Sequence, residues 1–316
     1  MVFILTQLVP GEPELAYLSQ RNLSDKEVVA AFRARWGLDQ PLYIQYFKYM
    51  GNLVQGDLGT SFRTNRPVLV DLKQYLPATI ELALVAIIIA TFFGILFGVL
   101  SATWPNSFID HFLRTISVTG VSIPSFWFAL LVLYVFYFHL GWSPGPGRIG
   151  AWSTPADPIT NFYIIDSIIQ KKWDILKESL HHIFWPALVL GTFTMGLITR
   201  TNRSSLLETM SMDYIRTARA KGLGKLAVVT RHAFGNAFIP VITVIGLGFG
   251  NLLGGAVLVE TIFSWPGIGM YAYRSAVSLD YPAITGVALL IAVNYVIINL
   301  IVDILYGIID PRIRYQ

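Results

Sequence analysis

The side chains that could perform chemistry are few, and their spacing does not build a metal site. The sequence has five histidines and no cysteine. His181 and His182 are adjacent, so on a helix they point about 100° apart and cannot easily share one metal ion. No HExxH pattern joins the other histidines. We therefore predict no metal site and no catalytic residue, and we interpret the histidine pair as interfacial.

A phosphate-binding loop is also missing from the pattern. Such a loop requires GxxxxGK[ST], and the single Gly-Lys pair, Gly224-Lys225, is followed by leucine and lacks the leading glycine. We therefore predict that this chain binds no cofactor. If ATP drives its activity, separate polypeptides bind the ATP and Mg²⁺.

Three carboxylates bear on ion coupling. Glu81, Glu260 and Asp303 lie at or near the ends of apolar runs and not at their midpoints. Ionisable groups at mid-depth in a membrane usually mark ion relays or other functional sites. The pattern therefore disfavours an ion-coupled secondary transporter and an intramembrane enzyme, which both stay as alternatives.

The composition is that of a membrane protein. Hydrophobic residues make up 54% of the chain and charged residues only 13%, and the mean hydropathy is +0.57, whereas soluble domains carry about 25% charged residues. A pI near 9.2 is compatible with nucleic-acid binding. The positive charge, however, is concentrated beside apolar runs, so membrane topology explains it better and we expect no nucleic-acid partner.

Five uncharged runs are long enough, with their flanks, to span a bilayer. They cover residues 82–100, 115–138 with a bend near Pro124, 183–199, 232–259 and 281–302. Residues 1–9 are apolar but short, and we interpret them as the remnant of a first span whose beginning is missing. Residues 10–76 are expected to form an external segment with short helices, and Pro77 is expected to open the transmembrane domain, residues 77–316. The expected fold is an all-α membrane protein with six spans in the full chain.

The densest positive charge lies in the loop 201–238 and its flank. From Arg200 to Phe238 there are seven basic and two acidic residues, a net charge of +5, which places this loop in the cytoplasm. Residues 204–221 contain no Gly or Pro, their apolar residues recur at helical spacing, and Gly222 supplies a stop. We predict a cytoplasmic helix offered to a partner protein. A cationic amphipathic helix that rests on anionic lipid is the alternative.

Small and polar residues recur inside the apolar runs. Gly246, Gly250 and Gly254 repeat every four residues, a spacing that lets two membrane helices approach closely. We expect this stripe to contribute to a contact between two subunits. Candidates for lining a water-filled path, with hydrogen bonding between helices as an equal alternative, are Ser117, Thr119, Ser122, Thr243, Asn251 and Asn294.

An ordered set of stretches resembles the permease subunits of binding-protein-dependent ABC importers, and especially the first permease of the dipeptide/oligopeptide/nickel group. The run DYIRTARAKGLGKLAVVTRHAFGNAFIPVIT resembles the family's cytoplasmic signature loop. Further matching stretches are VPGEP, GLDQPLYIQY, QGDLGTSF, RPVLVDL, LPATIELAL, VSIPSFW, ETIFSWPGIG and DPRIR. The resemblance covers nearly the whole chain, and the set is specific although each motif alone is weak.

The resemblance implies a type I importer permease fold in which the loop forms two short helices, the coupling element, which sits in a groove on a cytoplasmic ATPase. Ile215 and Ala218 would pack into the groove, and Gly222 would permit the reversal of the chain. Cations that would meet acidic rim residues are Arg216, Arg219 and Lys221, and Asp213 belongs to the same coupling segment. Where the wider family has an acidic residue and two alanines, this chain has Arg216, Thr217 and Ala218, so no acidic contact is assigned there.

The implied partners are a second homologous permease, two ABC ATPase subunits, an extracytoplasmic solute-binding protein and the lipid bilayer of the cytoplasmic (inner) membrane. The implied function is import of dipeptides or oligopeptides by alternating access, without enzymatic activity in this chain. Oligosaccharides and nickel complexes, which other permeases of this group carry, stay as alternative substrates.

Overall fold

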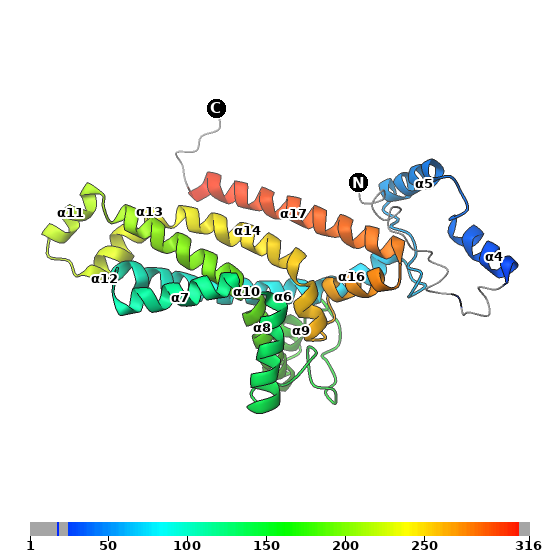
Figure 1. Cartoon of the computed structure of the whole chain (residues 1–316), viewed down its shortest axis with the longest axis horizontal. Helices are drawn as coiled ribbons and strands as arrows, with labels where there is room; N and C mark the ends of the chain where they lie inside the picture. The colour runs from blue at the N-terminus through cyan, green and yellow to red at the C-terminus, as the bar shows by residue number, and fades with distance from the viewer. Residues whose placement is uncertain (1–17, 19–24, 310–316) are drawn as a thin grey trace.

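The computed structural model describes residue 18 and residues 25–309 (Figure 1). Residues 1–9, predicted to be a remnant of a first span, lie outside the described residues, as does the terminal DPRIR stretch. Within the described part the regular elements are helical, with one isolated bridge between Thr60 and Pro67. The expectation of an all-α fold is confirmed.

Three long helices are apolar enough to cross a membrane: α6 (Val68–Thr103), α10 (Trp173–Thr209) and α17 (Tyr281–Ile309). Two bent pairs pass the same test. The first joins α7 (Phe108–Ser122) to α8 (Ser125–Val132) and the π-helix η1 (Leu133–His139). The second joins residues 225–237 to α14 (Ile239–Gly255). With each pair counted once, the described residues contain up to five spans, in the places that the apolar runs predict.

The remaining helices are short and connect or flank the spans. Before α6 lie α4 (Lys26–Trp36) and α5 (Leu42–Val54). Between the spans lie α9 (Tyr163–Ile169), α11 (Asp213–Ala220), α15 (Val257–Ile262) and α16 (Ile268–Val277). The first arm of the second bent pair consists of α12 (Lys225–Val228), the π-helix η2 (Val229–Ala233) and α13 (Phe234–Ala237).

The start of α6 differs from the expectation that Pro77 opens this helix. The helix begins at Val68, and Pro77 lies inside it. Proline cannot donate to the carbonyl four residues earlier and normally weakens a helix interior. The turns before Pro77 are nevertheless held, because Val68 and Leu72 are buried against Tyr271 of α16 and Ala283 of α17.

The bend near Pro124 is confirmed, and it is sharper than a kink. The axes of residues 108–122 and 125–139 differ by 108°, so α8 points away from the direction of α7 (Figure 1). A residue before proline is driven out of the helical region, and Ile123 has extended backbone angles of φ −76° and ψ 126°. Residues 115–138 are therefore two arms and not one straight span.

The prediction of one cytoplasmic helix over residues 204–221 is wrong. Residues 204–209 continue α10, the chain turns at residues 210–212, and α11 begins at Asp213. Leu206 is fully buried, so the packed part of α10 continues beyond the basic residues Arg200 and Arg203. The turn is closed by the amides of Ser211 and Met212, which donate to the carbonyls of Glu208 and Thr209 at 3.1 Å.

The bundle is centred on the close packing of α6 against α10. A Cβ on Gly191 of α10 would lie 2.7 Å from the carbonyl oxygen of Ala86. A Cβ on Gly98 of α6 would lie 2.6 Å from the side-chain amide nitrogen of Asn202. Glycine therefore sets the distance between the two helices. Asn202 also donates to the carbonyl of Ile95 at 3.0 Å, which fixes the register of α10 on α6.

Candidate functional site

The basic segment forms a separate cap at one end of the long helices. Figure 1 shows α11 and α12 at the end opposite to α4 and α5. The chain reverses direction between α11 and α12 at Gly222, which has φ +82°. No heavy atom lies within 4 Å of a Cβ placed on Gly222. The need for glycine there is thus conformational and not steric.

The apolar face of α11 packs on its own chain. Ile215 is 0% exposed and Ala218 6% exposed, and both belong to a cluster with Leu206 of α10, Val228 of α12 and Val229 of η2. The expectation that Ile215 and Ala218 insert into a partner's groove is therefore wrong. A helix of eight residues is unstable alone in water. This one is held because Ile215 and Ala218, which are three residues apart, both pack against the cluster that includes α10.

The outward face of α11 combines cations with apolar side chains. Asp213, Arg216, Arg219 and Lys221 are exposed, and Arg216 contacts Asp213 at 3.3 Å. Exposed apolar side chains beside them are Met212, Tyr214, Leu223 and Leu226. We refer to this set, from Met212 to Leu226, as the coupling face.

Tyr214 is the residue of the coupling face that the sequence analysis missed as a contact. Its side chain is 43% exposed, and its hydroxyl accepts a hydrogen bond from Asn236 of α13 at 2.8 Å. The ring is therefore held in place while one side is free. Tyr214 lies at helical spacing from Met210, but the turn at residues 210–212 interrupts the helix, so this spacing does not give the face on which Tyr214 lies.

A buried ion pair ties the helices together beneath the coupling face. The guanidinium of Arg203 donates twice to the carboxylate of Asp110, at 2.8 and 2.7 Å. Ser101, at the end of α6, donates its hydroxyl to the same carboxylate. Asp110 is 0% exposed, so this cluster joins α6, α7 and α10. Arg203 consequently belongs to the packing, although it was counted among the charges of the basic segment.

The opposite end is built from buried carboxylates with donors around them. Glu260 accepts from the Thr79 hydroxyl at 2.7 Å and the Met270 amide at 3.0 Å, which joins α15, α6 and α16. Glu81 forms an ion pair with Arg148 at 2.5 Å. These partners agree with a structural role for Glu81 and Glu260 in place of an ion relay.

A loop in the segment 140–172 is organised by one more carboxylate. Asp166 of α9 accepts from the Thr160 hydroxyl at 2.7 Å and from the amides of residues 159, 160 and 161 at 2.9 to 3.2 Å. Burial raises the pKa of Asp166, but these hydrogen bonds outweigh it and hold the pKa below its ordinary value. The loop is thus clamped by an ionised group.

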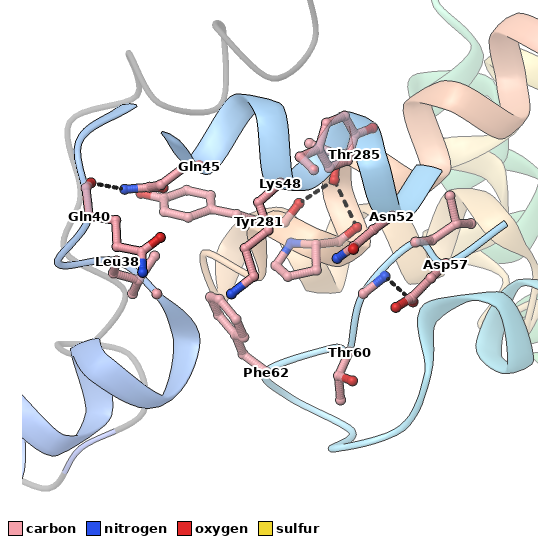
Figure 2. A pocket seen from close by; sticks show the side chains of 15 residues that line it. Leu38, Gln40, Gln45, Lys48, Asn52, Asp57, Thr60, Phe62, Tyr281 and Thr285 are labelled. Carbon is pink, nitrogen blue, oxygen red and sulfur yellow. Dashed lines mark hydrogen bonds between the residues drawn. The ribbon is translucent and has the colours of Figure 1, made fainter. Parts of the chain in front are cut away.

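A small pocket lies between α5, the bridge segment and the start of α17 (Figure 2). Its volume is about 200 Å³. The Gln45 amide donates to the Gln40 carbonyl at 2.7 Å, and the Thr285 hydroxyl donates to the carbonyls of Tyr281 and Pro282. Lys48 and Asp57 also line it. The pocket is far along the chain and the molecule from the coupling face.

The glycine stripe contacts a helix of the same chain. A Cβ on Gly246 would clash with the side chain of Val302, and a Cβ on Gly250 or Gly254 would also contact residues of α17, at 3.5 and 3.6 Å. The spacing predicted close helix packing, but the expected subunit contact is an internal contact between α14 and α17. Helix spacing cannot tell which helix approaches.

The polar residues proposed to line a path are not gathered in one place. Ser122 lines a cavity between α7 and α10, and Asn294 lines a small pocket between α14 and α17. Thr243 is half-buried and Asn251 is exposed on α14. Within the described residues, the α7–α10 cavity brings two of the sequence candidates together, because Ser117 lines it as well as Ser122.

Comparison with known proteins identifies the family. Residues 94–315 match the family described as "Binding-protein-dependent transport system inner membrane component". The chain is 45% identical over 313 residues to the probable D,D-dipeptide transport system permease protein DdpB of Escherichia coli K12, covering 99% of this chain and 92% of that protein. It is also 45% identical over 318 residues to the dipeptide transport system permease protein DppB of Alkalihalophilus pseudofirmus, covering 100% and 94%.

A more distant relative and a solved structure agree. The glutathione transport system permease protein GsiC of Salmonella paratyphi A is 37% identical over 316 residues, covering 100% of this chain and 93% of that protein. An inward-facing structure of the MetNI methionine ABC transporter matches with a TM-score of 0.52 at 16% identity, covering 74% of this chain and 93% of that chain. At that identity the match supports the fold alone.

Proposed function

The chain belongs to the family of binding-protein-dependent transport system inner membrane components, and on this premise we propose that it is the membrane-spanning subunit of an ATP-driven peptide importer. It is a multi-pass inner-membrane transport subunit, and ATP hydrolysis belongs to separate subunits. The proposed substrates are dipeptides or oligopeptides. The observation that carries this proposal is 45% identity over nearly the whole chain to relatives named as dipeptide permeases.

The coupling face is the proposed contact with the ATPases. Tyr214, Leu223 and Leu226 supply exposed apolar surface at the cytoplasmic end, and the exposed cations Arg216, Arg219 and Lys221 surround it. Apolar anchors inside a polar rim are the usual anatomy of a protein interface. The groove contact first assigned to Ile215 and Ala218 therefore passes to these residues.

The proposed mechanism is alternating access. ATP binds the closed arrangement of two partner ATPases preferentially, and this difference in affinity shifts the equilibrium of the whole assembly. The ATPases move the coupling face, which is fastened to α10, α12 and η2 through the cluster around Ile215. The ATP and Mg²⁺ sites lie in the ATPases, a second permease completes the pathway, and a solute-binding protein delivers the peptide to the end near α4, α5 and α16.

Reconstitution tests the proposal. We would assemble the permease in proteoliposomes together with the second permease encoded beside it, the ATPases and the binding protein. Uptake of labelled dialanine is then followed with and without ATP. ATP-dependent uptake that vanadate abolishes is expected. Uptake without ATP that an ionophore abolishes would instead assign the chain to ion-coupled transport.

A further inference from the structure

A cavity lined by both polar and apolar side chains lies between α7 and α10, toward the coupling face. Its volume is about 490 Å³, within the range of small-ligand sites. One face of each helix lines it. The lining residues that carry polar groups are Arg114, Ser117, Ser122, Thr199, Arg200, Arg203 and Ser204.

The cavity has an excess of positive charge. Arg203 is neutralised by its paired hydrogen bonds to Asp110. Arg114 and Arg200 are exposed toward it, and within the described part of the chain neither forms an ion pair. Among the described residues, no carboxylate lines the cavity. Two unpaired guanidinium groups on facing helices fit an anionic group, and a carboxylate is the group that arginine binds with two parallel hydrogen bonds.

The rest of the cavity continues away from the arginines as a groove lined by both polar and apolar side chains. Ser117 and Ser122 follow Arg114 along α7, and eight residues of helix correspond to about 12 Å. Two extended amino-acid residues measure about 7 Å, so a dipeptide fits along the groove with its carboxylate at the arginines. Gly196 forms the narrow part, since a Cβ there would lie 2.6 Å from the Ser117 carbonyl.

Resting on the proposed import function, we infer that Arg114 and Arg200 form a subsite for the terminal carboxylate of a transported peptide on the cytoplasmic half of the pathway. The other source of an anion is the headgroup of an acidic phospholipid. The lining combines serine and threonine side chains with Val118 and Val121. We favour the peptide because the groove has the length of a dipeptide, and binding measurements separate the two sources. Arg200 also lies on α10, nine residues before the end of the helix that holds α11.

Equilibrium binding tests this subsite. The assembled transporter, without nucleotide and without the binding protein, is placed in phosphatidylcholine nanodiscs and titrated with labelled dialanine and with dialanine amide. The wild-type protein is expected to bind the free acid at least about tenfold more tightly, because a charge-assisted hydrogen bond is lost in the amide. R114Q and R200Q should each weaken dialanine binding about tenfold and leave amide binding unchanged.

The matched control is R274Q, which removes an exposed arginine of α16 outside the cavity and should bind dialanine like wild type. Equal wild-type affinity for acid and amide, or unchanged binding in both cavity variants, overturns the inference. A lipid result also overturns the inference. In that case phosphatidylglycerol raises the melting temperature of the wild type but not of R114Q and R200Q, and dialanine has no effect, which assigns the cavity to lipid. ATP-driven uptake by the wild-type assembly is measured in parallel: uptake with a negative binding result rejects the subsite alone, and absent uptake rejects the transport function.

Discussion

Replacing Ile215 with alanine removes the side chain that fastens α11 to the rest of the protein. Ile215 is 0% exposed and packs in the cluster with Leu206, Val228 and Val229. Truncation of a buried isoleucine to alanine costs about 2–5 kcal/mol. The only other buried side chain of α11 is the methyl group of Ala218, so little remains to hold this eight-residue helix. We therefore expect α11 to open locally while the membrane bundle stays folded.

Hydrogen exchange on the purified permease complex measures this opening. A loss of about 2 kcal/mol or more corresponds to exchange at least about thirtyfold faster in the second half of α11, with no change in α6 or α10. The matched control is Y214A, which truncates a side chain that is 43% exposed. It should leave exchange in α11 nearly unchanged and weaken binding of the ATPase subunits.

The reverse pattern would refute the assignment of faces on α11. If I215A leaves exchange unchanged but abolishes ATPase binding, and Y214A affects neither, then Ile215 contacts the partner and the buried cluster is not what holds the helix.

Four further outcomes test other parts of the structure. G222V should abolish ATP-driven uptake without reducing insertion into the membrane, because a β-branched residue at φ +82° costs about 1–3 kcal/mol; G222N, which tolerates this angle, should retain uptake. D110N should lower stability by about 3–5 kcal/mol by leaving Arg203 unpaired, and adding R203M should restore part of it in a thermal melt. G246V should lower the melting temperature by overpacking α14 against α17. The loop clamped by Asp166 should keep its protection from exchange at neutral pH and lose it as the pH falls through the lowered pKa, whereas D166N should lack this protection at every pH.

Hydropathy predicted the places of the spans because lipid and protein interior select the same apolar residues. It could not predict the extra turns of α6 before Pro77, which depend on contacts of Val68 and Leu72 with helices about 200 residues later. It also could not give the angle at Pro124. Proline breaks the hydrogen-bond ladder, but the contacts of the two arms decide how far they diverge.

The coupling segment shows the same limit at the level of single residues. Charge and the stop at Gly222 located the segment, and the resemblance assigned its role. Two apolar residues that are three positions apart, such as Ile215 and Ala218, do not reveal whether they pack on their own chain or on a partner, so the orientation of Ile215 was missed. The pairing of Asp110 with Arg203, separated by 93 residues, has no local signal either.

The positions of these contacts along α10 restrict how the coupling face can act on the pathway. Within seven residues this helix carries Arg200 at the cavity, Arg203 in the ion pair and Leu206 beneath α11, a distance of about 9 Å along the axis. The ion pair fixes α10 to α7 at one end of the cavity, and the close approach at Gly196 fixes the same two helices at its narrow part. A displacement of α11 therefore moves both walls of the cavity together. We therefore expect the 62° bend before α14 to act as the hinge. Access would then alternate by motion of the α6–α7–α10 unit against α14 and α17, with the carboxylate subsite carried as a rigid part of that unit.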